Sequence, residues 1–177
     1  MHTGDCNMIL QKTILPEIQY EQDRRALCLL DPYGLHLDWE VIRMAGQLKT
    51  VDMFLNFPVM DMNMNVLWTD QPNQDTTQLA GMSRFWGDES WRETAYSSQG
   101  FLFADMTEKQ SNDAIAAAFR ERLQSIAGFK NVPQPLAMRN STNSVLYYLF
   151  FASPKDVANK IVENIFNKHR WGKRNGN

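Results

Sequence analysis

A short apolar run that stops at an acid and a proline constrains this chain more than any other feature. Residues 26–30 read Ala-Leu-Cys-Leu-Leu, with arginines before them and Asp31-Pro32-Tyr33-Gly34 directly after. Such a run between charged residues and a Pro/Gly stop is typical of a strand buried on both faces. In an open α/β sheet, ligands bind just outside the carboxyl ends of parallel strands. We therefore expect Asp31 and Tyr33 at the functional edge of a sheet.

A second apolar run, residues 50–58, also ends at a proline and completes a strand–helix–strand unit. The helix between the two runs is predicted from an N-terminal acid and an apolar stripe, namely Asp38, Trp39, Ile42, Ala45 and Leu48. A connection of this kind is right-handed and requires parallel strands. Asn56 should then lie beside Asp31 on one rim of the sheet.

Periodicity and prolines predict the other helices. Apolar residues at near-helical spacing favour a helix over 8–22 that ends or bends at Pro16. The period-two pattern of 60–65 fits a strand or a helix, and short helices are expected over 81–96. The strongest helical signal covers 111–128.

Two further strands and a closing helix are expected at the end of the chain. Residues 145–152 are rich in aromatic and β-branched side chains, which favour a strand. Residues 130–140 contain two prolines and are at best an edge strand. A helix follows Ser153, and its predicted buried stripe is Val157, Ile161 and Ile165.

This order of elements predicts one α/β domain over 1–177. Its sheet would be partial and Rossmann-like, mostly parallel with an antiparallel edge strand, with helices on both faces and a helical insert at about 60–110. A length of 177 residues with 44% hydrophobic content suffices for one core and is short for two.

Cysteine usage and hydropathy indicate a cytoplasmic setting. Cys6 and Cys28 give no disulfide framework. There is no long apolar run and no secretory leader, so we expect neither a membrane span nor a signal peptide.

Positive charge gathers at the end of the chain. From residue 130 onward, eight Lys and Arg stand against two Asp and Glu, a balance of +6, while the whole chain is −2. The candidate phosphate contacts are Lys130, Arg139, Lys168, Arg170, Lys173 and Arg174. The alternative is that these residues form only a solvated face.

Short motifs stand in a recognisable order along nearly the whole chain. They are Gly4–Asn7, Leu30–Leu35, Val51–Pro58, Phe85–Gly87 with Trp91, Tyr96, and Leu146–Ser153. In this order they resemble the three-Cys-motif partner proteins. Members of that family look like class I S-adenosylmethionine-dependent methyltransferases, and the family name implies a companion protein with a three-cysteine motif.

The resemblance implies roles for particular residues. Asp5 and Asn7 would contact the cofactor S-adenosylmethionine, because Gly4-Asp5 would follow the strand at which an acid commonly meets its adenine. Asp31, Pro32 and Tyr33, together with Asn56, would form the catalytic rim. One part of the family pattern is absent, since the chain has no Gly-x-Gly loop to hold the methionine end of the cofactor. The sequence is then a truncated reading of a longer gene, or its fold is completed by another chain.

Each candidate residue also has a structural interpretation. Asp31 would orient an exocyclic amine while an aromatic residue stacks on the base, although Asp-Pro is also a common turn initiator. Asn56 would line the rim or cap an Asx turn. Trp86 and Trp91 would stack on nucleobases or pack the insert against the sheet. His2 and Cys6 have ligand-like spacing but no second pair, so we expect no metal site.

Three functional hypotheses follow. The chain is an incomplete S-adenosylmethionine-dependent methyltransferase domain linked to nucleic-acid substrates and inactive in isolation. Alternatively, it is a non-catalytic partner or scaffold for a three-cysteine companion, or a nucleic-acid-binding module. Oligomerisation is compatible with each of them.

Overall fold

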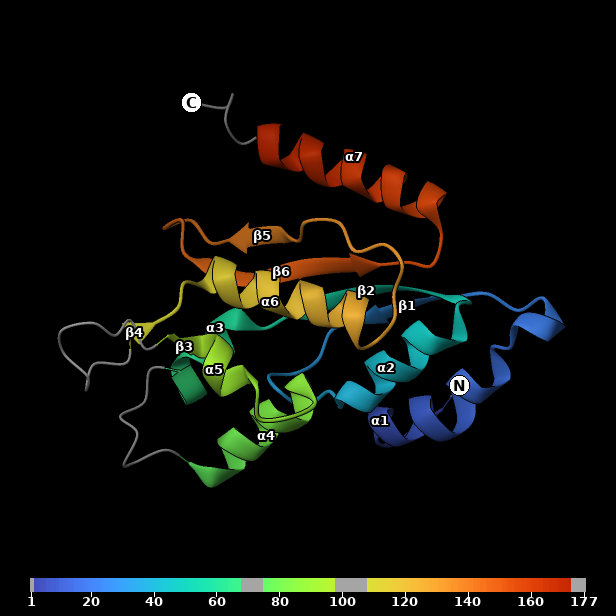
Figure 1. Ribbon diagram of the computed structural model, residues 1–177, viewed down its shortest axis with the longest axis horizontal. Helices are drawn as coiled ribbons and strands as arrows, with labels where there is room; N and C mark the ends of the chain where they lie inside the picture. The colour runs from blue at the N-terminus through green and yellow to red at the C-terminus, as the bar shows by residue number, and fades with distance from the viewer. Residues whose placement is uncertain (1, 68–74, 98–107, 173–177) are drawn as a thin grey trace.

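The computed structural model describes residues 2–67, 75–97 and 108–172 and shows an α/β fold built on one mixed sheet (Figure 1). The strands of that sheet are β1 (Ala26–Leu30), β2 (Val51–Phe57), β5 (Leu136–Arg139) and β6 (Val145–Ala152), and β3 (Tyr96–Ser97) pairs with β4 (Glu108–Lys109) separately. The helices are α1 (Cys6–Ile9), α2 (Trp39–Leu48), α3 (Val59–Met62), α4 (Thr76–Trp86), α5 (Trp91–Ala95), α6 (Asn112–Ser125) and α7 (Asp156–Gly172). Shorter helical turns are η1 (Leu10–Ile14), η2 (Leu15–Glu17), η3 (Tyr20–Gln22) and η4 (Asn63–Leu67).

The strand order is β1-β2-β6-β5. β1 and β2 are parallel, as the strand–helix–strand pattern predicts, whereas β6 is antiparallel to both of its neighbours. The prediction of a mostly parallel sheet with an antiparallel edge strand is therefore wrong, because two of the three strand pairings are antiparallel and the reversed strand lies inside the sheet. The turn over 140–144 explains this, since it folds β6 back between β5 and β2, and the prolines before β5 suit an edge.

One face of the sheet carries the main core. Alternate residues of β2, from Val51 to Phe57, are completely buried on this face. Helices α2 and α6 cover it, and Phe119 of α6 lies at its centre. The Phe119 ring is 4.6 Å from the Phe57 ring and 5.5 Å from the Phe150 ring, centroid to centroid. The core therefore joins α6 directly to the two central strands.

Helix α7 covers part of the opposite face. Phe151, Val162 and Phe166 form a buried cluster there, and Phe54 and Ala158 pack against it. The predicted stripe is wrong: Val157, Ile161 and Ile165 are 70%, 55% and 48% exposed. α7 is rotated by one position from that expectation, because the large Phe166 ring and Val162 fill the space over β6.

Strand β1 is not buried on both faces, contrary to the expectation from its apolar run. Leu27 and Leu29 are 59% and 70% exposed, whereas Ala26, Cys28 and Leu30 pack against the main core. The reason is that β1 has a neighbour on one side only within the described sheet, and α7 packs over β2, β5 and β6 rather than β1.

The other helical predictions are met in part. The segment 8–22 is helical but divided into short pieces, with Pro16 near the start of η2. The ambiguous segment 60–65 is helical, in α3 and η4. α6 ends at Ser125, so Ile126 lies outside its buried stripe. Within the described ranges, no helix is long and apolar enough to cross a bilayer.

A close backbone contact at Gly46 gives a first prediction. A Cβ atom at this position of α2 would lie 2.2 Å from the carbonyl oxygen of Ala127. Gly46→Ala should therefore lower the free energy of unfolding by about 1–3 kcal/mol, as overpacking does, measured by urea denaturation. Gly81→Ala is the matched control, because its Cβ would meet only Leu35 Cβ at an ordinary 3.7 Å. Equal stability of the two variants would contradict the prediction.

Candidate functional site

The carboxyl ends of β1 and β2 bring Asp31 and Asn56 into direct contact. Leu30 and Leu55 are paired in the parallel register, so the next residue of each strand lies at the same rim. The Asn56 Nδ2 atom donates a hydrogen bond of 2.6 Å to Asp31 Oδ1. The predicted neighbourhood of the acid and the amide is thus present.

The Asp31 carboxylate keeps acceptor capacity after this hydrogen bond. The residue is exposed, and it takes part in none of the salt bridges between described residues. An ionised carboxylate can accept several hydrogen bonds. Asn56 differs, because its Oδ1 atom is buried and has no hydrogen-bond partner among the described residues. The pair therefore presents an exposed carboxylate to solvent, with one of its oxygens hydrogen-bonded to the half-buried Asn56 amide.

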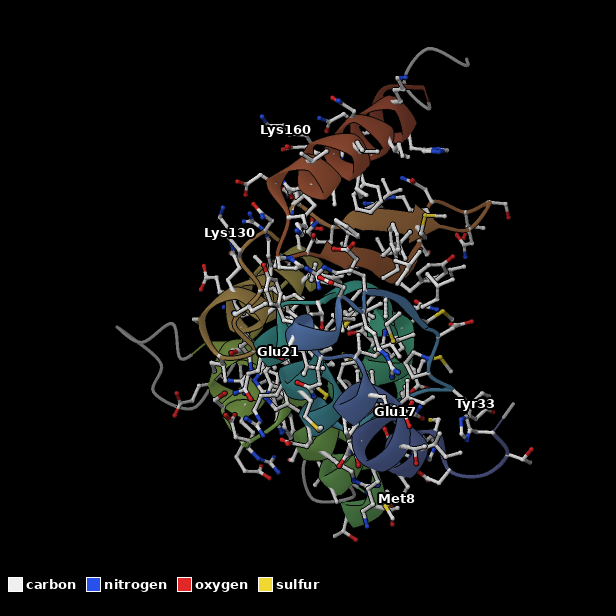
Figure 2. All side chains as sticks on the ribbon, turned by 90° about the vertical axis from the view of Figure 1, so that its right-hand side faces the viewer. Met8, Glu17, Glu21, Tyr33, Lys130 and Lys160 are labelled. Atoms are coloured by element: carbon white, nitrogen blue, oxygen red, sulfur yellow. The ribbon has the colours of Figure 1, made fainter. Side chains whose placement is uncertain are left out.

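The loop after β1 carries an exposed aromatic ring two residues beyond Asp31. Tyr33 is 90% exposed and stacks on His36, with ring centroids 6.3 Å apart and an interplanar angle of 22°. Figure 2 shows Tyr33 projecting from the side of the molecule opposite Lys130. The loop itself is anchored, because Leu35 and Leu37 are buried in the core. The exposed Tyr33 ring is thus carried by a loop whose backbone is anchored in the core.

Asp61 borders the same loop. The sequence analysis did not single out this residue. Gly34 has φ +56°, and a Cβ there would lie 3.0 Å from Asp61 Oδ2. Asp61 Oδ1 accepts a hydrogen bond of 2.9 Å from Asn65 Nδ2. The signal was present as the alternation of Met with Asp or Asn over 60–65. The helical fold of this segment brings Asp61 and Asn65 one turn apart, on one side.

The two residues expected to bind the cofactor have structural contacts. Asp5 caps α1 by accepting a hydrogen bond of 2.9 Å from the Met8 amide. Asn7 is buried, and both of its amide atoms bond the loop that follows β1: Nδ2 donates to the His36 carbonyl and Oδ1 accepts from the Asp38 amide, each at 2.9 Å. These contacts fix α1 against the loop. Asn7 therefore does not fit a cofactor contact, and Asp5 offers only its second oxygen.

The basic residues predicted to contact nucleic acid do not lie together in one described patch. Arg139 and Arg170 line a groove of about 670 Å³ beside β5, between α6 and α7. Arg170 donates to the backbone carbonyls of Gln134 and Pro135, so it also holds α7 in place. Lys168 is exposed on α7, whereas Lys173 and Arg174 lie outside the described residues.

The wall of this groove contains a phenol–carboxylate pair, in which Tyr148 is buried and Asp113 is exposed. The Tyr148 hydroxyl donates a hydrogen bond of 2.5 Å to Asp113 Oδ1 at the start of α6. Burial, reinforced by the Asp113 carboxylate, raises the pKa of Tyr148 well above its usual value. The phenol therefore stays protonated and acts as a donor at neutral pH.

The two tryptophans considered as stacking platforms belong to the core. Trp86 and Trp91 are both 1% exposed, and their indole nitrogens donate to Ser90 Oγ at 3.0 Å and Ser83 Oγ at 2.9 Å. They pack the insert against the sheet, which was the structural alternative. They are not available to a base.

Arg122 holds the turn that follows Trp86. Its guanidinium donates to the Trp86 carbonyl, Asp88 Oδ2 and Ser90 Oγ at 2.8–3.0 Å. Partial burial raises the pKa of the Asp88 carboxyl, but the hydrogen bonds from Ser90 and Arg122 outweigh it, and the pKa lies below its usual value. Gly87 has φ +102°, and a Cβ there would lie 2.5 Å from the Trp39 ring. The Phe85-Trp86-Gly87 motif thus has a packing role.

No metal centre is formed by the described residues, among which no group of three or more His, Cys, Asp or Glu side chains could hold an ion. His2 and Cys6 are both exposed near the start of the chain. Burial raises the pKa of the Cys28 thiol, which disfavours the thiolate form that a metal would need.

The raised pKa of Tyr148 predicts a loss of stability at alkaline pH. An unfolded tyrosine ionises near pH 10, whereas the folded phenol keeps its proton to higher pH. The stabilisation is therefore complete below about pH 10 and is lost as the pH rises toward the folded-state pKa. Tyr148→Phe should show a shallower decline of unfolding free energy above pH 10, measured by urea denaturation. Tyr147→Phe is the control for loss of a phenol, and identical slopes in the parent chain and Tyr148→Phe would refute the assignment.

Comparisons with protein-family models, with curated proteins and with solved structures find no match to this chain. The resemblance to the three-Cys-motif partner proteins therefore stays a prediction. The function has to be argued from the rim itself.

Proposed function

We propose that this chain is a methyltransferase-like protein of the three-Cys-motif partner type, and that its rim recognises the amino-bearing base of a nucleic acid. The observation that carries the proposal is the hydrogen bond between Asn56 and Asp31 at the adjoining ends of two parallel strands. It holds one oxygen of an exposed carboxylate and leaves the other free to accept a hydrogen bond. An exocyclic amine is a donor that such a carboxylate can accept.

The loop after β1 supports the same ligand class. A base whose amine reaches Asp31 needs a flat surface for its ring, and Tyr33 is almost fully exposed on an anchored loop. Stacking of a base on an aromatic side chain is worth about 1–3 kcal/mol and tolerates any base. The acid therefore supplies the discrimination between bases, and the ring supplies affinity that is independent of sequence.

The direction of the strands places a cation on the same edge of the sheet. β5 runs in the same direction as β2, so Arg139, at its end, lies toward the edge that carries Asp31 and Asn56. Arg139 is exposed and donates only to the Asn143 carbonyl among the described residues. A strand whose base sits at the rim could place a phosphate against this guanidinium.

The described residues do not form a complete cradle for S-adenosylmethionine. Asn7 is committed to the loop over 36–38, and no Gly-x-Gly loop occurs in the chain. When bound, the cofactor would supply the methyl group. The residues of this chain would orient the acceptor: Asp31 accepts from the amine, Asn56 holds Asp31, and Tyr33 stacks on the ring.

Binding of short single-stranded DNA tests the proposal. Oligo-dA and oligo-dC carry exocyclic amines and oligo-dT does not, so the first two should bind more tightly in fluorescence anisotropy. Asp31→Ala should remove this preference, a change of about tenfold or more, because a hydrogen bond to a charged group is worth about 1.5–3 kcal/mol. Tyr33→Ala should lower the affinity for all three oligomers by the same factor.

Two controls keep the test specific. Glu121→Ala removes an exposed acid from α6, and Tyr20→Ala removes another exposed aromatic ring. Both should bind as the parent chain does. Equal affinity for the three oligomers, or loss of binding in the controls, would rule out recognition at the rim.

A non-catalytic partner of a three-cysteine protein is the second candidate. The observation that favours it is the use of Asn7 and Asp5, which hold α1 in place instead of facing a ligand. A fold that uses its cofactor positions for packing can act through association alone.

Co-expression separates this candidate from the first. A tagged chain should retain a three-cysteine-motif companion through affinity purification and gel filtration, and isothermal titration calorimetry should show no heat with S-adenosylmethionine. The association should survive Asp31→Ala, because it does not depend on the rim. Cofactor binding by the purified chain, without retention of the companion, would exclude this alternative.

A further inference from the structure

The outer edge of β1 has backbone groups that no described strand pairs. The Ala26 amide donates to the Thr50 carbonyl at 3.1 Å, so the amide and carbonyl groups of alternate residues, Ala26, Cys28 and Leu30, point toward β2. Those of Leu27 and Leu29 point away from β2. The same two leucines have the most exposed side chains of the strand. An open edge of this kind is a template for another strand.

We propose that β1 pairs in antiparallel fashion with β1 of a second copy of this chain, about a two-fold axis that passes beside Cys28. The symmetric register places Leu27 opposite Leu29 of the second copy. It likewise places Leu29 opposite Leu27 of the second copy. Both residues have outward-pointing backbone groups, so each pair exchanges two hydrogen bonds. A two-fold interface uses one patch on both copies, which requires the patch to be complementary to itself.

The charges that flank the strand meet this requirement. In the register centred on Cys28, Arg25 lies directly opposite Asp31 of the second copy. At the other end of the paired strands, Asp31 lies opposite Arg25 of the second copy. Both side chains are exposed, and neither forms a salt bridge among the described residues. Arg25 donates to the Arg24 carbonyl and lies 4.7 Å from the Tyr20 ring. Opposite charges across a strand pair are favourable, and like charges are not.

The side chains agree with the same register. Leu27 and Leu29 are paired with Asp52 and Phe54 of β2, so they lie on the α7 side of the sheet. A two-fold axis perpendicular to the sheet keeps this side common to both copies, and the four leucines become neighbours. A shift of the register by two residues separates both charge pairs and leaves one leucine of each copy without a leucine opposite it. One register therefore satisfies the backbone, the leucines and the charges together.

The second copy would add a residue to the rim. Arg25 of that copy reaches Asp31, whose carboxylate also accepts from Asn56. Only this consequence rests on the proposed function; the pairing of the strands does not. The other candidate occupant of the edge is a strand from a different polypeptide, such as a three-cysteine companion.

Charge reversal tests the register. Sedimentation equilibrium of the purified full chain should give the mass of two copies. Arg25→Asp and Asp31→Arg should each weaken the dimer by about tenfold or more, because each places like charges opposite one another twice. The double variant Arg25→Asp/Asp31→Arg should restore the dimer to within about threefold of the parent. Arg24→Asp is the matched control. It makes the same change of charge, but residue 24 would lie opposite the uncharged Pro32 of the second copy, so the dimer should persist.

Mass is the readout, so the result is independent of base or cofactor binding. Leu29→Lys, a charge on the exposed edge, should also give a monomer. A parent chain that is monomeric at all concentrations overturns the proposal and leaves the edge to a different polypeptide. A dimer that both single reversals leave intact, or that the double variant fails to restore, overturns it as well.

Discussion

The parallel pairing of β1 and β2 is the constraint on which the rest of the structure depends. It orients both strands so that their last residues meet, which produces the contact between Asp31 and Asn56. It also makes β2 one of the two central strands, with β6 on its other side. The aromatic core around Phe119 and the cover by α7 are both built on strands that β2 holds in place.

Local sequence patterns predicted this unit because its signals are strong and short-range. The two apolar runs, the prolines that end them and the stripe of α2 each depend on neighbouring residues alone. The same holds for the edge position of β5 and for the strand at 145–152. The meeting of Asp31 with Asn56 then followed from the rule that parallel strands end at one rim.

The errors come from features that depend on distant parts of the chain. The place of β6 inside the sheet results from a turn that returns it beside β2, which periodicity does not reveal. The exposure of Leu27 and Leu29 results from the place of β1 at the edge of the described sheet, where α7 does not cover it. The buried face of α7 was misjudged by one position, since both adjacent stripes are apolar and the sheet beneath decides between them. The two hydrogen bonds of the Asn7 amide also join it to a distant loop, which a local motif does not reveal.

The contacts of Arg122 have a consequence for the cooperativity of unfolding. One guanidinium joins α6 to the Trp86 carbonyl and to two side chains of the next turn, and it lies 5.0 Å from the centre of the Trp39 ring of α2. Separation of α4 and α5 from the sheet would leave this charge with few partners inside the protein. Helices α4 and α5 should therefore unfold together with the core rather than before it. Its amide hydrogens should exchange with solvent at rates close to those of β2 and β6.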